Sequence, residues 1–235
     1  MTYRVEQKQW LAVLGGATRY GNEQVITAFK VGREIARKGK NLVTGGTTGI
    51  PYAAAMGAKQ EGALVVGISP AASFEEHLIR YKKPLDYADF IVYTGTGVAG
   101  RSSILLQSVP GAVFIGGEFG TLNEFSAAWM CGNNVLGVLL GTGGVSERFQ
   151  DILSDIETTW GSKAIFDLDP IELVHKVCEE VDQMYSTRSS QLQADEIGRD
   201  VRNIIGQFLD EESERSCVKQ SATIPIGVPS TINLL

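Results

Sequence analysis

Residues 114–124 read FIGGEFGTLNE, and this stretch is the most specific element of the sequence. It combines an apolar run typical of a buried strand, a turn with three glycines, and a helix predicted to begin at Thr121. Glycines let the backbone come close to a ligand. The free N–H groups and the dipole at the start of the helix favour an anion. The stretch therefore predicts an anion site, such as a phosphate site, between a strand and a helix.

The same order of apolar run, glycine cluster and helical segment recurs from Trp10 to Leu168. Short continuous apolar strands that alternate with helices are typical of a parallel sheet covered on both faces. We therefore predict an α/β fold, a Rossmann-like doubly wound parallel sheet of about six or seven strands. Fourteen of the 27 glycines fall in five clusters, each just after an apolar run, at positions 15–16, 45–49, 95–100, 116–120 and 141–144. Ligands bind outside the carboxyl ends of such strands, so the clusters, beginning with Gly15 and Gly16, are expected to line a ligand-binding edge.

The composition changes near the C-terminus, which predicts a division of the chain into residues 1–185 and 186–235. Residues 191–209 carry apolar side chains at spacings typical of an amphipathic helix, which needs a partner surface. Residues 216–235 lack acidic side chains. We interpret them as a flexible or partner-binding tail.

Composition and charge exclude several classes of protein. The net charge of −6 and the pI of about 5.1 argue against a nucleic-acid partner. Two basic stretches, 33–40 and 80–83, are interpreted as solvated helix ends. The three cysteines match no metal spacing, so no metal site is predicted. The polar N-terminus and the lack of a long apolar run predict a cytoplasmic protein without a signal peptide or a membrane span.

Several local patterns allow more than one interpretation. Thr121 and Glu124 fit a capping box as well as they fit a phosphate-binding hydroxyl and a catalytic carboxylate. Residues 95–100 match G-x-G-x-x-G without the acidic residue that a dinucleotide site needs, so they are interpreted as a loop over the site. His77 and His175 are expected to have surface or structural roles. Residues 141–144 either close the pocket or only turn the chain.

The segment 114–124 resembles the P-G-G-x-G-T-x-x-E motif of the LOG-type ("lonely guy") proteins, once described as lysine decarboxylases. The resemblance covers roughly residues 11–185. Residues 43–50, VTGGTTGI, stand where the family has its first glycine-rich loop, and Arg101 precedes the motif strand as the family's catalytic arginine does. The combination of residues 100–102 (GRS), 115–121 (IGGEFGT) and 140–144 (LGTGG) is most similar to the branch of molybdenum-cofactor carrier proteins.

The resemblance implies an activity and a set of site residues. LOG enzymes are nucleoside 5′-monophosphate phosphoribohydrolases, so Glu124 would stabilise the oxocarbenium-like transition state or activate water. Arg101 would hold the phosphate or polarise the leaving base. The ligand- and phosphate-binding residues implied are Gly15, Gly16, Gly45, Gly46, Thr47, Gly116, Gly117, Glu118, Gly120 and Thr121.

Two departures from the enzyme pattern favour binding over hydrolysis. Glycine, glycine and glutamate stand at 116–118 in place of proline and two glycines, and Ser102 follows the arginine in place of lysine. We therefore carry two hypotheses. The first is an enzyme that releases a base and ribose 5-phosphate without any required cofactor. The second is a non-catalytic carrier or sensor of a bound nucleotide or molybdenum cofactor. A homodimer or higher homo-oligomer is expected in both cases.

Overall fold

The computed structural model describes residues 9–132, 134–156, 161–189, 201 and 203–212. They fall in one unit within residues 1–185 and a second within 186–235. In the second unit residues 203–212 are helical, and Ile204, Ile205 and Phe208 are exposed there. The rest of the predicted amphipathic stretch and the tail 216–235 lie outside the described residues. The nucleotide-binding role of 1–185 and the partner-binding role of 186–235 stay predictions.

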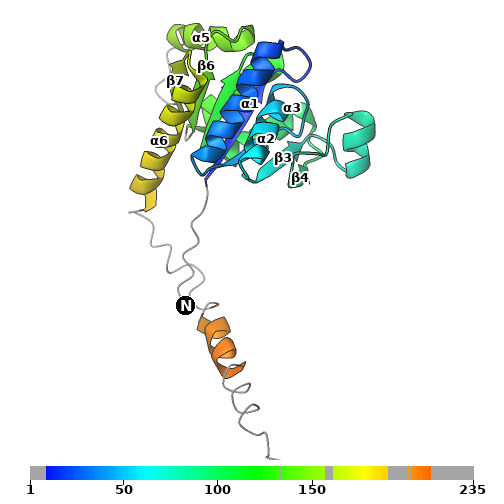
Figure 1. Ribbon diagram of the computed structural model, residues 1–235, viewed down its shortest axis with the longest axis vertical. Coiled ribbons are helices and arrows are strands. Elements are labelled where there is room, and N and C mark those ends of the chain that lie inside the picture. The colour runs from blue at the N-terminus through cyan, green and yellow to red at the C-terminus, as the bar shows by residue number, and fades with distance from the viewer. Residues whose placement is uncertain (1–8, 133, 157–160, 190–200, 202, 213–235) are drawn as a thin grey trace, which may run out of the picture. The chain divides into compact units, whose positions relative to one another are not determined.

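The described part of the first unit is built on one sheet of seven parallel strands (Figure 1), in the order β4-β3-β2-β1-β5-β6-β7. Each strand pairs in parallel with its neighbours, which confirms the predicted sheet. The strands are β1 (Trp10–Gly15), β2 (Asn41–Thr44), β3 (Val65–Ser69), β4 (Phe90–Tyr93), β5 (Gly111–Ile115), β6 (Val135–Leu139) and β7 (Lys163–Asp167).

Helices cover both faces of this sheet, and alternate side chains of β1 enter two separate hydrophobic cores. Leu11 and Val13 belong to the core beneath α1, α2 and α6, whereas Ala12 and Leu14 belong to the core beneath α3, α4 and α5. This period of two is the pattern of a strand buried on both sides. The helices are α1 (Asn22–Arg37), α2 (Ile50–Gln60), α3 (Gly97–Gln107), α4 (Phe119–Cys131), α5 (Phe149–Asp155) and α6 (Pro170–Ser189), with the short η1 (Glu76–Arg80, a π-helix) and η2 (Gly144–Arg148, a 3₁₀-helix).

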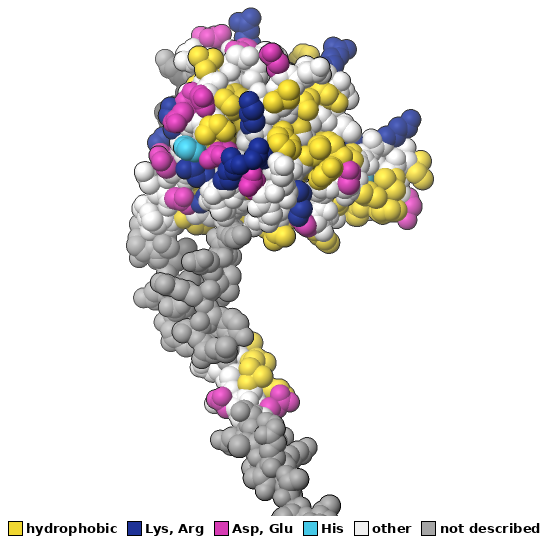
Figure 2. All heavy atoms as spheres, viewed as in Figure 1, with side chains coloured by type: hydrophobic (Ala, Val, Ile, Leu, Met, Phe, Trp, Pro, Cys, Tyr) yellow, Lys and Arg dark blue, Asp and Glu magenta, His cyan; other side chains and the backbone are white. Residues whose placement is uncertain are grey.

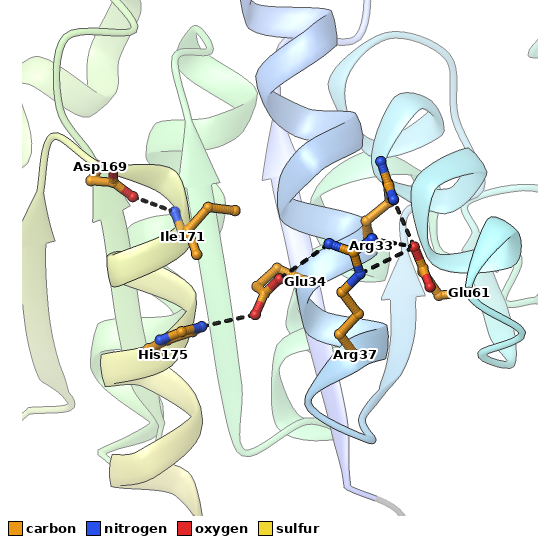
Figure 3. A network of polar contacts seen from close by, with 7 residues as sticks. All are labelled: Arg33, Glu34, Arg37, Glu61, Asp169, Ile171 and His175. Carbon is orange, nitrogen blue, oxygen red and sulfur yellow. Dashed lines mark hydrogen bonds and ion pairs between the residues drawn. The ribbon is translucent and has the colours of Figure 1, made fainter.

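A polar network joins three helices on one face (Figure 3). Glu34 of α1 contacts His175 of α6, with 2.8 Å between Oε1 and Nε2, and Arg37 lies 3.9 Å from its other oxygen. Arg33 and Arg37 both bind Glu61, which follows α2. Positively and negatively charged side chains accordingly lie side by side on the face that carries α1 and α6 (Figure 2). His175 therefore has the structural role expected of it, far in sequence from the ligand-binding motifs.

The starts of α3 and α4 differ from the sequence-based interpretation of residues 95–100 and of Thr121, and both differences matter for the site. The structure begins α3 at Gly97, so residues 97–100 form its first turn, which corrects the interpretation of 95–100 as a loop. A Cβ on Gly100 would lie 2.8 Å from the Cβ of Thr96, so this glycine permits the tight turn. The structure begins α4 at Phe119 with Glu118 as N-cap, so Thr121 cannot be the cap of a capping box with Glu124.

Candidate ligand-binding site

The site lies where the direction of the chain across the sheet reverses. From β1 the chain continues outward through β2, β3 and β4, whereas β5 lies on the other side of β1 and leads to β6 and β7. Such a switch point leaves a crevice between the loops that follow the two central strands. Gly15 ends β1 and residues 16–19 follow it, whereas Glu118–Thr121 follow β5, and both segments line one cavity of about 240 Å³.

Nine of the twelve predicted site residues line this cavity, and three do not. Glu118, Thr121 and Glu124 come from the end of β5 and from α4. Arg101 comes from α3, which packs beside α4. The structure thus brings four segments that are far apart in the sequence together around one cavity. The predicted residues that line it are Gly15, Gly16, Gly45, Thr47, Arg101, Glu118, Gly120, Thr121 and Glu124.

The other three, Gly46, Gly116 and Gly117, shape the loops behind the wall. The N–H of Gly116 donates to Thr142 Oγ1 at 3.0 Å, and the N–H of Gly46 donates to Thr44 Oγ1 at 3.2 Å. These donors are therefore already used within the protein. Gly117 has a φ of +90°, and a Cβ there would lie 2.1 Å from Thr121 Oγ1. Residues 141–144 accordingly support the loop after β5 and are absent from the described lining of the cavity.

Arg101 and Glu124 form a buried ion pair inside the cavity. Arg101 Nη1 donates to Glu124 Oε1 at 3.2 Å, and the two side chains are only 7% and 10% exposed. Burial raises the pKa of Glu124, and the nearby Arg101 opposes that rise. Burial lowers the pKa of Arg101, and Glu124 opposes that fall. Arg101 Nε is buried with no hydrogen-bond partner among the described residues.

Gly45 makes room for this pair. A Cβ at position 45 would lie 2.3 Å from Arg101 Nη1, so only glycine leaves space for the guanidinium here. The resemblance implied that Gly45 is one of the ligand- and phosphate-binding residues. It does line the cavity, and its lack of a side chain also decides where Arg101 lies.

Ser102, which stands where the LOG enzymes have lysine, lies next to the pair. Its hydroxyl donates to the carbonyl of Val98 at 3.0 Å, and Oγ is 3.5 Å from Glu124 Oε1. At the mouth of the cavity Glu118 lies 3.6 Å from Arg19, and both side chains are at least half exposed. Glu118 is therefore balanced by a cation from the opposite loop.

Sequence reasoning missed the three lining residues from the segment between β3 and β4, which are Pro70, Tyr81 and Lys83. The interpretation of 80–83 as a solvated helix end holds for Arg80 and Lys82, which are exposed, and is wrong for the half-buried Lys83. Burial and the nearby Arg101 lower the pKa of Lys83. No local pattern marks this lysine, because its place depends on the path of a whole loop.

Two absences hold for the residues that the structure describes. These residues contain no group of three or more His, Cys, Asp or Glu side chains arranged to hold a metal ion. None of their helices is both long and apolar enough to cross a membrane. The cytoplasmic location stays a prediction.

The model of one protein family, the SLOG cluster4 family, matches residues 8–165. The chain belongs to the SLOG cluster4 family. This assignment confirms the resemblance to the LOG-type superfamily, since the matched residues include the switch point and both members of the Arg101–Glu124 pair. An uncharacterised protein of Archaeoglobus fulgidus is 37% identical over 122 residues, which are 51% of this SLOG cluster4 protein and 74% of the relative.

Two solved structures resemble this SLOG cluster4 protein over most of their length. The protein TM1055 is 26% identical with a TM-score of 0.61, and the match covers 73% of this chain and 99% of TM1055. The molybdenum cofactor carrier protein of Chlamydomonas reinhardtii is 26% identical with a TM-score of 0.56, and the match covers 77% of this chain and 99% of the carrier.

Proposed function

We propose that the cavity binds a nucleotide-like ligand by its phosphate, which the start of α4 receives. Gly120 and Thr121 line the cavity, and the side chain of the N-cap Glu118 makes no hydrogen bond to the first turn. The first N–H groups of a helix have no partner within the helix, and its dipole favours an anion at that end. The observation that carries the proposal is that Arg101 lines the same cavity as this helix start.

We propose further that the protein holds its ligand as a carrier or sensor. A likeness to the carrier protein of Chlamydomonas reinhardtii supports a nucleotide or the molybdenum cofactor as cargo. Both are phosphate-bearing ligands, and a cation in the same cavity as a helix start suits that chemistry. The two departures at Ser102 and Glu118 also favour holding over hydrolysis.

Hydrolysis of a nucleoside 5′-monophosphate is the second candidate, favoured by the buried carboxyl of Glu124. In this reaction water adds to C1′ of the ribose and the C1′–N bond breaks. The electron pair of that bond leaves with the base, which takes up a proton, and water supplies the hydroxyl of ribose 5-phosphate. Glu124 would stabilise the oxocarbenium-like transition state or accept the proton of water. A carboxyl with a raised pKa in a cavity is typical of acid–base sites.

The test measures binding and base release side by side. Calorimetry with the four common nucleoside 5′-monophosphates measures binding, and chromatography measures free base. Molybdenum in the purified protein is measured by mass spectrometry. The variants are Arg101→Ala and Glu124→Gln, with the exposed Arg148→Ala and Glu179→Gln as matched controls.

We expect wild type and both controls to bind at least one phosphate-bearing ligand, and Arg101→Ala to bind it at least tenfold more weakly. Base release that disappears in Glu124→Gln while binding persists would establish the enzyme. Binding without base release would establish the carrier or sensor. A wild type that binds none of the nucleotides and carries no molybdenum would contradict the proposal.

A further inference from the structure

The segment between β3 and β4 brings one lysine into the cavity and leaves its neighbour outside. This segment stands beside β3 and β4 and carries η1 (Figure 1). Tyr81 and Lys83 line the cavity, whereas Lys82 between them is exposed and has a φ of +50°. Positive φ is uncommon for a residue other than glycine and is kept only where the surroundings enforce it. The backbone is thus bent so that Lys83 enters the cavity.

The buried His77 holds the backbone of Lys83 in place. The N–H of Lys83 donates to the carbonyl of His77 at 3.1 Å. His77 Nε2 lies 3.1 Å from the carbonyl oxygen of Pro84, and Nδ1 lies 2.8 Å from Ser69 Oγ. Because a carbonyl only accepts, Nε2 carries the hydrogen, and in the neutral ring Nδ1 accepts from the Ser69 hydroxyl. Through these contacts His77 links Lys83 and Pro84 to Ser69, the last residue of β3.

Lys83 is the cation in the cavity that has no ion-pair partner among the described residues. Arg101 is paired with Glu124, and Arg19 is paired with Glu118. Among the described residues no carboxylate lies within ion-pair distance of Lys83. Burial and repulsion from Arg101 also lower its pKa, which indicates that its positive charge is poorly compensated.

The lining extends across several strands. Pro70 directly follows β3 and Gly120 follows β5, and both line the cavity. β3 and β5 are separated by β2 and β1, so at about 4.8 Å per strand their axes are about 14 Å apart. A ligand that reaches from the start of α4 to the β3 side is therefore larger than one phosphate group.

We propose that Lys83 binds a second anionic group of the ligand, separate from the phosphate at the start of α4. The ligand class is then a nucleotide with two phosphate groups rather than one. This inference rests on the proposed function for the first phosphate and adds the second. Lys83 acts as a specificity residue and His77 as the residue that positions it.

The first experiment tests the lysine without any nucleotide. Lysines are acylated with acetic anhydride near neutral pH, and the extent at each position is read by peptide mass spectrometry, with and without inorganic phosphate at constant ionic strength. We expect phosphate to slow acylation of Lys83 at least threefold and to leave Lys82 unchanged. Equal rates at Lys83 with and without phosphate would overturn the second anion site.

The second experiment compares ligands with one and two phosphates. The probes are the 5′-monophosphates, 5′-diphosphates and 3′,5′-bisphosphates of adenosine and guanosine, measured by calorimetry with wild type, Lys83→Met and Lys82→Met. We expect wild type and Lys82→Met to prefer a two-phosphate probe at least tenfold, and Lys83→Met to lose that preference. Retained monophosphate binding in Lys83→Met separates this loss from unfolding.

The outcomes of the two experiments separate this inference from the proposed function. Nucleotide binding that Lys83→Met and Lys82→Met change equally would overturn the inference and leave the proposed function standing. Protection of Lys83 by inorganic phosphate, with no nucleotide bound by wild type, would support the second anion site and contradict the proposed nucleotide ligand.

Discussion

Removal of the charge on Glu124 is the most direct perturbation of the site. In Glu124→Gln the side chain keeps its shape, and its oxygen can still accept from Arg101 Nη1. The guanidinium of Arg101, only 7% exposed, loses its counter-charge. A buried charge without a partner is costly. We therefore expect the variant to fold with a lower free energy of unfolding.

The magnitude follows from the geometry of the pair. With an effective dielectric constant of about 20, charges 3.2 Å apart attract each other by about 5 kcal/mol. The burial cost of the carboxylate disappears together with its charge, so the net loss is smaller. Breaking a buried pair costs about 3–5 kcal/mol. The raised pKa of Glu124 means that its buried charge already offsets much of this, so we expect a loss of about 1 kcal/mol here. For a chain of this size that corresponds to a fall in Tm of about 2–4 °C.

Urea unfolding of the full chain, followed by circular dichroism, measures this loss. The exposed Glu179→Gln on α6 is the matched control and should change the free energy of unfolding by less than about 0.5 kcal/mol. The double variant Arg101→Met/Glu124→Gln has neither buried charge, so it should recover most of the loss. A Glu124→Gln variant as stable as the control would refute the reasoning, as would single losses that simply add in the double variant.

Three further predictions concern the same part of the molecule. Gly45→Ala should displace the guanidinium of Arg101 and cost about 1–3 kcal/mol in urea unfolding, whereas Gly120→Ala, with open space around its Cβ, should cost less than about 0.5 kcal/mol. Arg101→Met should raise the pKa of Glu124 further. A carboxyl group whose pKa is higher in the folded state than in the unfolded state favours the fold while it is protonated, and this contribution is lost as the group ionises. The free energy of unfolding of Arg101→Met should therefore fall more steeply than that of wild type as pH rises above 4.5. Light scattering at micromolar concentration should give a homodimer or a larger assembly, which Phe119→Asp should weaken because Phe119 is 88% exposed on α4; a monomeric wild type would contradict this.

Much of the fold could be predicted from local patterns. The helix at Ile50–Gln60 is an example, since Pro51 lies in its first turn and an apolar strand and a glycine cluster precede it. The start of α4 was predicted two residues late, because Thr121 has the chemistry of a cap while the backbone turns at Glu118. Which residue caps a helix depends on the path by which the chain leaves β5, and that path is held by contacts with residues 141–144.

Part of the candidate site could likewise be predicted from the sequence, and part of it could not. Arg101 and Glu124 were predicted as a pair from motifs 23 residues apart, and the structure joins them at 3.2 Å. The space at Gly45 and the place of Lys83 could not be predicted, because both depend on side chains that approach from other elements. A motif identifies which residues carry charge, but the burial that leaves one charge paired and another unpaired arises only when distant segments pack together.

The sequence by itself therefore determined the parallel sheet, the edge at which we propose that ligands bind and the residue types that meet there, because strand polarity and glycine clusters are local properties. Only the tertiary structure decided which glycines line the cavity, which make room for Arg101, and that Lys83 faces inward. Those outcomes depend on excluded volume and on the desolvation of charges, and both are set by contacts between segments far apart in the chain.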